Sequence, residues 1–344
     1  MRRIQAELKL PFAAFFDSLR FAMACRQALG PVDLLYERMG WMGYGGALAS
    51  RLLNVPLVLE VNGDHYAEFE ALGIAPRGAQ RMLSMAVTRY AARRAALVVA
   101  TGEGWRRRFI ERWHVDPARV AVVENGSELV DVLARAELRA FQGAVLATPV
   151  RLVYVGGFEP WHGIGVLLDA VAQVVAQGTP LNVELIGKGS EEAHIRRRIA
   201  DLKLADVVEL SGYLDASALA QRLAQADIGL SPYCGRVEYS GLKLLDYKAA
   251  GLAIIASGAG GEPAVVRHGE SGLIVPPCNV DALAAAIGKL AADRQLCQRF
   301  GQTARQEAEQ LHSWSHTAQE LDALFRGLVP AGSSWTARRT EQGT

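Results

Sequence analysis

Cysteine is scarce in this chain and never clustered. The 344 residues include four cysteines, Cys25, Cys234, Cys278 and Cys297, and no two of them form a C-x-x-C pair. This spacing excludes the usual zinc-binding and dithiol motifs. Isolated cysteines are typical of free thiols in a reducing compartment, so the sequence predicts free thiols here.

Long hydrophobic runs are also missing. No apolar stretch is long enough to cross a bilayer. Two arginines precede an apolar patch at residues 12–16, but an acid, a lysine and a proline lie between them, and no small-residue cleavage site follows. This pattern argues against a signal peptide. We therefore expect a cytoplasmic protein.

Charge of one sign does not dominate. Lys and Arg total 37 against 36 Asp and Glu, and the net charge is +1, so no global field favours nucleic acid as a partner. Arginines gather locally at residues 89–94 and 106–108. Such stretches are usually solvated helix faces, but contact with an anionic membrane surface remains an alternative.

Short apolar segments alternate with helical patterns along most of the chain. A first series of predicted strands lies at 32–36, 56–61, 97–101 and 120–123, with helices at 42–53, 80–95 and 103–113. A second series has strands at 152–155, 183–186, 207–210, 228–231, 253–257 and 273–275, with helices at 166–176, 191–202, 216–224, 242–250 and 280–290. The strands are continuously apolar, as parallel strands buried on both faces are. Repeated strand–helix units predict doubly wound α/β domains.

The two series are separated near residues 141–149, where Gly143 and Pro149 suit a linker. We therefore predict an amino-terminal domain over 1–145 and a carboxyl-terminal domain over 146–312. A last helix at 313–329 is expected to return to the first domain, and the Gly/Ser/Thr-rich tail at 330–344 to be disordered.

Glycine-rich turns follow several strands of the second series. They read GGFEPWHGIG (156–165) and GKGS (187–190), and SGY (211–213) follows the third strand. Ligands of parallel sheets sit at such strand ends, where glycine amides and helix amino termini suit phosphate. Lys188 is a candidate phosphate contact and Tyr213 a candidate base contact. Each turn taken alone also fits a plain loop. No strand carries an uninterrupted G-x-G-x-x-G, which disfavours a dehydrogenase.

Two acids flank the next strand–helix turn, in EYSGLKLLD (238–246). Glu238 precedes the Gly turn, and Asp246 lies about one helical turn inside the helix. Ionised carboxylates accept O–H donors, and the helix amino terminus between them suits a diphosphate. Acids at this spacing are common by chance. A further glycine cluster at 257–262 strengthens the case for an anionic ligand.

In this order, the segments resemble the second domain of the family 4 retaining glycosyltransferases, which have the GT-B fold. The matching motifs are YVGGFEPWHG (154–163), LIGKG (185–189), GLKLLDYKAAGLAIIAS (241–257) and GLIVPP (272–277). The similarity runs from about residue 150 to residue 277. It implies an α/β protein of two facing Rossmann-like domains with parallel sheets.

The resemblance also implies residue roles. Glu238 and Asp246 match the family's E-x7-E motif, in which the first acid contacts the donor sugar and the second holds the ribose hydroxyls. Asp246 is one methylene shorter than the usual Glu. Backbone amides near Gly241 and Leu242 would meet the diphosphate. The family is generally metal-independent, so no metal and no cofactor are expected.

The family usually has an Arg and a Lys on the first loop of this domain, where this chain has Gly157 and His162. Lys188, Arg236 and Lys243 are candidates to supply the missing charge. His162 carries charge only when protonated, which would make activity pH-sensitive. The predicted donor-binding residues are Gly156, Gly157, His162, Gly187, Lys188, Gly189, Tyr213, Arg236, Gly241, Leu242, Lys243 and Asp246.

Residues 32–62 resemble the middle of the family's acceptor domain, which usually begins with an earlier strand and a Gly-rich loop. The first domain is therefore predicted to be shortened at its amino terminus. The family often has a His after the strand that matches residues 57–61. Asn62 and His65 are the nearest candidates, and His65 joins Glu238 as a predicted catalytic residue.

Two functions follow from the resemblance. The first is a retaining transferase that moves a hexose from a UDP- or GDP-sugar to a glycan or lipid-linked acceptor, in synthesis of cell-surface polysaccharide or glycoconjugate. It would be cytoplasmic, with peripheral contact to the inner face of the membrane as an option. The second is a catalytically weak or truncated nucleotide-sugar-binding protein, suggested by the shortened first domain.

Overall fold

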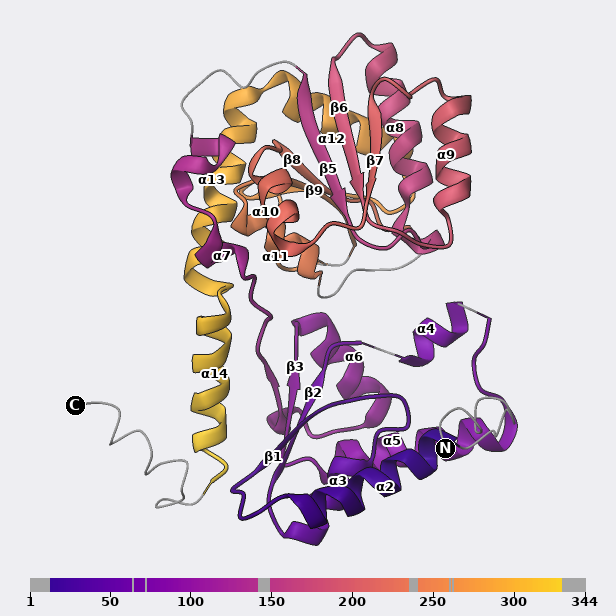
Figure 1. Ribbon diagram of the computed structural model, residues 1–344, viewed down its shortest axis with the longest axis vertical. Helices are drawn as coiled ribbons and strands as arrows, with labels where there is room; N and C mark the ends of the chain where they lie inside the picture. The colour runs from indigo at the N-terminus through magenta and orange to yellow at the C-terminus, as the bar shows by residue number, and fades with distance from the viewer. Residues whose placement is uncertain are drawn as a thin grey trace, which may run out of the picture. The chain divides into compact units, whose positions relative to one another are not determined.

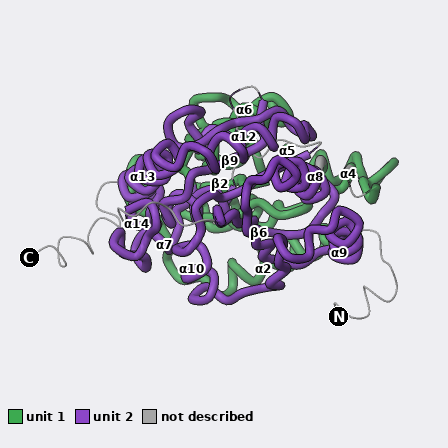
Figure 2. The backbone as a smooth tube through the Cα atoms, turned by 90° about the horizontal axis from the view of Figure 1, so that it is seen from above, with its two compact units in different colours: residues 1–124, 318–344 green, residues 125–317 purple. Residues whose placement is uncertain are grey.

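The computed structural model describes residues 13–63, 65–71, 73–141, 149–234, 241–259, 261 and 263–329. The chain forms two compact units. Unit 1 comprises residues 1–124 and 318–344, and unit 2 comprises residues 125–317 (Figure 2). Each unit has its own parallel sheet, so the prediction of two parallel α/β domains is confirmed (Figure 1).

The sheet of unit 1 has four parallel strands in the order β1-β2-β3-β4. They are β1 (Leu35–Arg38), β2 (Leu57–Val61), β3 (Leu97–Ala100) and β4 (Val120–Val122). The helices before and between them are α2 (Ala13–Ala28), α3 (Gly45–Leu53), α4 (His65–Ala71), α5 (Gly78–Arg94) and α6 (Glu103–Trp113). The central strands β2 and β3 are almost wholly buried. On one face, Val58 and Val99 pack against Phe325 from helix α14 (Trp314–Arg326).

Strand β1 begins three residues later and ends two residues later than the predicted segment 32–36. Its ladder begins where its partner begins, with Leu35 paired to Leu57, and the Leu35 amide donates to the Pro56 carbonyl at 2.9 Å. β1 is an edge strand of this sheet with alternating exposure, so it tolerates the polar residues Glu37 and Arg38. Pairing, not apolar character, therefore decides the extent of this strand.

The sheet of unit 2 has six parallel strands in the order β10-β9-β8-β5-β6-β7. They are β5 (Val150–Val155), β6 (Leu181–Ile186), β7 (Val208–Gly212), β8 (Ile228–Ser231), β9 (Ala253–Ser257) and β10 (Gly272–Val275). The helices are α7 (Leu129–Val132), α8 (Ile164–Ala176), α9 (Glu192–Asp201), α10 (Ala216–Ala224), α11 (Leu242–Ala249), α12 (Val280–Ala292) and α13 (Arg294–Leu311). The strand order reverses between β5 and β8, and ligands of such sheets bind beyond the carboxyl ends of the strands at this switch point.

The compact units divide at residues 124/125, whereas the sequence placed the domain boundary at 145/146. Residues 125–141 pack within unit 2. Leu138 is fully buried there, and Arg139 forms a buried ion pair with Asp227 at 2.6 Å. Residues 142–148 of the predicted linker and the predicted disordered tail at 330–344 lie outside the described residues.

Arg305 on α13 ties three segments of unit 2 together. Its guanidinium is almost fully buried and donates hydrogen bonds to the carbonyls of Ala249 at 2.5 Å, Val130 at 2.9 Å and Leu133 at 2.9 Å. It also pairs with Glu309 at 2.7 Å. The side chain thus satisfies the last carbonyls of α11 and the carbonyls around α7, which helix ends leave without intrahelical partners.

Arg305→Ala is therefore expected to destabilise the fold strongly, by about 3 kcal/mol or more, because three buried carbonyls lose their donor. The free energy of unfolding in urea, followed by circular dichroism, measures this effect. Arg196→Ala is the matched control, since Arg196 forms an exposed pair with Glu192 on α9. Its loss should cost about 0.5 kcal/mol or less. Equal losses in the two variants would contradict the role given to Arg305.

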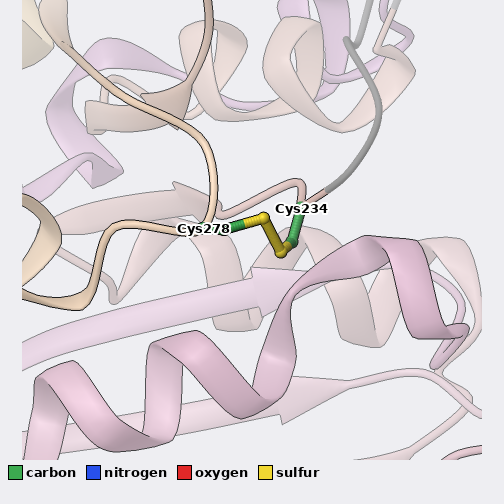
Figure 3. The surroundings of a disulfide bond; sticks show 2 residues. All are labelled: Cys234 and Cys278. Carbon is green, nitrogen blue, oxygen red and sulfur yellow. A yellow bond between two sulfur atoms is a disulfide. The ribbon is translucent and has the colours of Figure 1, made fainter.

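A disulfide joins Cys234 to Cys278, with the two Cα atoms 4.8 Å apart (Figure 3). The prediction of free thiols is therefore wrong for this pair and holds for Cys25 and Cys297. The two half-cystines are 44 residues apart in sequence, and they meet because the loops after β8 and β10 leave the same edge of the sheet. Cysteine usage therefore gives no support for a reducing compartment.

The double variant Cys234→Ser/Cys278→Ser should be less stable than the oxidised protein by up to about 4 kcal/mol, the loop-closure entropy of a loop of this length. Urea unfolding without reductant checks this expectation, and Cys25→Ser is the control that should change little. A thiol titration of the denatured, unreduced protein should find two free thiols. Four free thiols would contradict the pairing.

No helix in the described part of the chain is both long enough and apolar enough to cross a membrane.

Candidate functional site

Two glycine turns of unit 2 pack directly against each other. Gly156 follows β5 and Gly187 follows β6, and both have a φ of 145°. A Cβ on Gly187 would lie 1.8 Å from the Gly156 carbonyl oxygen, so no larger residue fits. The Gly156 amide donates to the Ile186 carbonyl at 3.0 Å. Gly156 and Gly187 thus form one continuous backbone surface, the floor of the predicted site, at the carboxyl ends of β5 and β6.

The buried ring of Phe158 fixes the next part of this floor. Its amide donates to the Lys188 carbonyl at 3.0 Å, and its own carbonyl accepts from the Glu191 amide at 2.9 Å. A Cβ on Gly189 would lie 2.4 Å from that carbonyl oxygen. Gly189 is therefore needed for close packing, while the Lys188 side chain is exposed at the rim.

Helix α11 begins at the same edge because Tyr247 anchors it to two strands. The Tyr247 hydroxyl accepts from the Val155 amide of β5 at 2.8 Å and donates to the Leu230 carbonyl of β8 at 3.1 Å. A Cβ on Gly229 would come within 2.5 Å of this ring. The amino terminus of α11, at Gly241 and Leu242, has amides without intrahelical partners and a positive dipole end, and both suit an anion.

Lys243 places a positive charge beside the first glycine turn. Its Nζ lies 4.5 Å from the Tyr233 ring centroid and 5.2 Å from that of Tyr154. A Cβ on Gly156 would meet the Lys243 Cε at 3.3 Å. The lysine is thus held between two aromatic rings near the floor of the site, and both contacts are favourable for a cation.

His162 is a loop residue that lies beside Gly157. Its Nδ1 accepts a hydrogen bond from the Glu159 amide at 3.3 Å, so the proton of the neutral ring is on Nε2. The ring packs edge-on against Tyr233, with centroids 5.0 Å apart. A Cβ on Gly157 would lie 3.3 Å from the His162 Cε1. The structure therefore brings His162 to the predicted site, beside Gly157 and Tyr233.

Asp246 is a largely buried carboxylate one helical turn beyond Lys243. The Ser127 hydroxyl donates to its Oδ1 at 2.6 Å. Burial raises the pKa of Asp246, the hydrogen bond from Ser127 opposes that rise, and the negative charge of Glu128 adds to it. A carboxylate in such surroundings gains from any further hydrogen-bond donor that a ligand offers.

Tyr213 follows β7 and is 77% exposed. Glu238 and Arg236 lie outside the described residues, so their predicted roles stay predictions. In the described part of the chain, no group of three or more His, Cys, Asp and Glu side chains is placed to hold a metal ion.

His65 belongs to unit 1. Its Nε2 lies 3.4 Å from the Met39 carbonyl oxygen, and its ring stacks on Phe69. It lines a cavity of about 20 Å³ with Trp41, Tyr66, Trp105, Arg108 and Arg112, among others. A cavity of this size holds about one water molecule, not a sugar ring.

Sequence reasoning missed three residues that shape the site, Ser127, Tyr233 and Tyr247. Ser127 stands in the segment VVENGS (122–127), and nothing in the sequence links it to a residue 119 positions later. Tyr247 lies within the helix motif and reads as an ordinary core residue. Only the register of α11 on the sheet reveals these contacts.

Two parallel α/β units, with glycine turns and a helix amino terminus at the switch point of the second, are the architecture of the GT-B glycosyltransferases. Comparison with solved structures agrees. Anabaena HepE in complex with UDP aligns with a TM-score of 0.74 at 21% identity, over 90% of this chain and 82% of that one. Sucrose-phosphate synthase from Thermosynechococcus elongatus aligns with a TM-score of 0.72 at 23% identity, over 92% and 79%.

Sequence families identify the group more narrowly. Residues 138–307 match the family "Glycosyl transferases group 1", and residues 3–126 match "Glycosyl transferase 4-like domain". The chain belongs to the family 4 glycosyltransferases.

Two curated relatives illustrate the range of the family. The chain is 28% identical to a phosphatidyl-myo-inositol mannosyltransferase of Mycolicibacterium smegmatis over 215 residues, covering 60% of this chain and 54% of that protein. It is 27% identical to a D-inositol 3-phosphate glycosyltransferase of Nocardioides sp. over 342 residues, covering 94% and 73%. The match therefore spans about half the length of the first relative.

Asp246→Asn should weaken UDP binding by about 10- to 100-fold, the usual contribution of a hydrogen bond to a charged group. Its stability should not fall. The folded protein binds the Asp246 proton more tightly than the unfolded chain does, so the ionised carboxylate is unfavourable for folding above its raised pKa. Wild-type affinity should also decrease as the pH falls through that pKa.

Calorimetric titration with UDP and thermal melting test both expectations. Asp201→Asn, an exposed acid at the end of α9, is the control. A variant at position 246 that binds UDP as tightly as wild type would exclude Asp246 from the donor site.

Proposed function

We propose that this chain transfers a hexose from a nucleoside diphosphate sugar to a hydroxyl of a glycan or lipid-linked acceptor, with retention of anomeric configuration. One observation carries the proposal. The amino terminus of α11, Lys243 and the paired glycine turns gather at the carboxyl ends of β5, β6 and β8 in unit 2. This edge offers backbone amides, glycine positions and a positive charge, as a diphosphate requires.

UDP is the first nucleotide to test. Two solved structures of Anabaena HepE contain UDP or UDP-glucose, and that protein shares the fold of this chain. GDP is the alternative, because a mannosyltransferase is among the relatives and the geometry of the described residues does not distinguish the bases. In either case, Asp246 would accept hydrogen bonds from the ribose hydroxyls, and Tyr213 would lie at the exposed edge beside the base.

Transfer breaks the bond between the anomeric carbon and a diphosphate oxygen, and forms one from that carbon to the acceptor oxygen. The acceptor hydroxyl loses its proton, and the nucleoside diphosphate is released. Negative charge grows on the departing diphosphate, so positive groups held in place beforehand lower the barrier. Lys243 and the α11 amides are the described groups that would do so. Lys188, Arg236 and protonated His162 would add charge, and Glu238 would contact the donor sugar.

The acceptor is proposed to meet unit 1. The relatives are named for acceptors that contain inositol and phosphate, namely phosphatidyl-myo-inositol and inositol 3-phosphate. Arg108 and Arg112 lie on α6 near His65 and give this part of unit 1 a positive charge. Such a surface suits an acceptor with a phosphate group. His65 is proposed as the residue nearest to the reacting hydroxyl.

Peripheral contact with an anionic membrane is proposed on the surface of α5. Arg77 caps this helix, and Arg81, Arg89 and Arg93 are exposed along it, together with the strongly exposed Met82. Basic and apolar side chains on one helix bind anionic headgroups and the acyl boundary together. A cytoplasmic location stays a prediction, and the Cys234–Cys278 disulfide is the observation that speaks against a reducing compartment.

Glu238→Gln should abolish most transfer while leaving UDP affinity within a few-fold of wild type, because the proposed contact is to the sugar. Release of UDP from UDP-glucose, with and without acceptor, measures transfer, and calorimetry measures affinity. Glu209→Gln, an exposed acid on β7, is the control. Wild-type protein that binds UDP without any turnover would favour a nucleotide-sugar-binding protein without transferase activity.

A further inference from the structure

The hydroxyl of Ser127 has a fixed hydrogen-bond direction. It donates to Asp246 Oδ1 at 2.6 Å and accepts from the Leu129 amide at 3.2 Å. A serine hydroxyl has a single proton, and an amide can only donate. The proton of Ser127 is therefore directed to the carboxylate. Among the described residues, no hydrogen bond reaches the other carboxylate oxygen, Oδ2.

The backbone around Ser127 is clamped, so the hydroxyl cannot drift. Ser127 is 2% exposed, and its amide donates to the His312 carbonyl at 2.8 Å. A Cβ on the preceding residue, Gly126, would lie 2.4 Å from the Trp314 amide nitrogen. The chain at 126–127 therefore lies directly on the junction between α13 and α14, where only glycine allows so close an approach.

The same residue, His312, is tied to the helix that carries Asp246. Lys248 lies two residues after Asp246 on α11, and its Nζ is 3.0 Å from the His312 Nε2, 2.8 Å from Glu307 Oε2 and 2.9 Å from the Val265 carbonyl oxygen. Ser127 and Asp246 are thus fixed to one another twice, through their own hydrogen bond and through His312. Their mutual geometry is preorganised before a ligand arrives.

We propose that Ser127 is a positioning residue for the nucleotide: by holding Oδ1 of Asp246, it directs Oδ2 toward the 2′- and 3′-hydroxyls of the ribose. This inference rests on the proposed function. Aspartate is one methylene shorter than glutamate, so it has less reach and more need of a fixed rotamer. The bond from Ser127 also lowers the pKa of Asp246, against the rise that burial and the nearby Glu128 cause. Both effects prepare Asp246 to accept hydrogen bonds from the ribose hydroxyls.

The test compares the Kd values of UDP and 2′-deoxy-UDP, measured by calorimetry. Wild type should prefer UDP by about 10- to 100-fold, because the deoxy ligand lacks one of the two hydroxyl donors to a charged acceptor. Ser127→Ala should reduce this preference to a few-fold, since Asp246 no longer points one way. A purely structural role for Ser127 would weaken both ligands equally and leave the ratio unchanged, which would overturn the proposal.

Three further variants test whether the change in the ratio of the two Kd values is specific to the contact between Ser127 and Asp246. Ser211→Ala removes another serine hydroxyl of unit 2 that donates to a carboxylate, that of Glu184 at 2.5 Å, and should keep the wild-type ratio. Ser127→Cys has nearly the same size but a weak S–H donor, and it should lose the preference even if the alanine variant does not fold. In an Asp246→Asn background, Ser127→Ala should add little, because the two residues act through one contact. Full additivity there would contradict the proposal.

Failure of the proposed function would look different. If wild type binds neither UDP nor GDP, the donor site itself is wrong. If wild type binds UDP and prefers it over the deoxy ligand, but Ser127→Ala keeps the same preference, the donor site stands and the role of Ser127 is wrong.

Discussion

The position of helix α11 depends on one hydroxyl group. Tyr247 links the helix to the amide of Val155 on β5 and to the carbonyl of Leu230 on β8, the two strands at the switch point. Gly229 provides the space for its ring. These two hydrogen bonds fix the position and rotation of the helix relative to the sheet. They therefore also determine where the helix amino terminus, Lys243 and Asp246 lie. A dipole that is not held in place would have to reorganise around an anion and would stabilise it less.

The sequence predicted the main architecture because that information is local. Parallel strands buried on both faces are continuously apolar, and β8 (Ile228–Ser231) and β9 (Ala253–Ser257) were found with their observed bounds. The glycine turns were also visible, since a position such as Gly187 cannot carry a Cβ beside the Gly156 carbonyl. Strand β1 was misplaced, because an edge strand takes its extent from its partner and not from its own side chains.

What the sequence could not reveal is contact between distant segments. Cys234 and Cys278 read as isolated thiols, and Ser127 was not singled out, because the partners of these residues are set by strand order and helix register. A zinc or dithiol motif is recognised by two cysteines separated by two residues, whereas pairs of distant residues have no such signature in the sequence. Glu238 remains a prediction from resemblance, because it lies outside the described residues.

Two charged residues on α11, Lys248 and Asp246, differ in how far neighbouring groups compensate their charges. This difference indicates which of them is suited to bind a ligand. Lys248 is 2% exposed and fully compensated by Glu307, the Val265 carbonyl and His312. His312 can accept from the lysine because burial, together with the charge of Lys248, lowers the pKa of the histidine to about 3 and keeps it neutral. Asp246 has one described hydrogen-bond donor and a raised pKa. Full compensation is what a structural charge needs, whereas an acid that is oriented but only partly compensated is stabilised further when a ligand supplies hydroxyl donors.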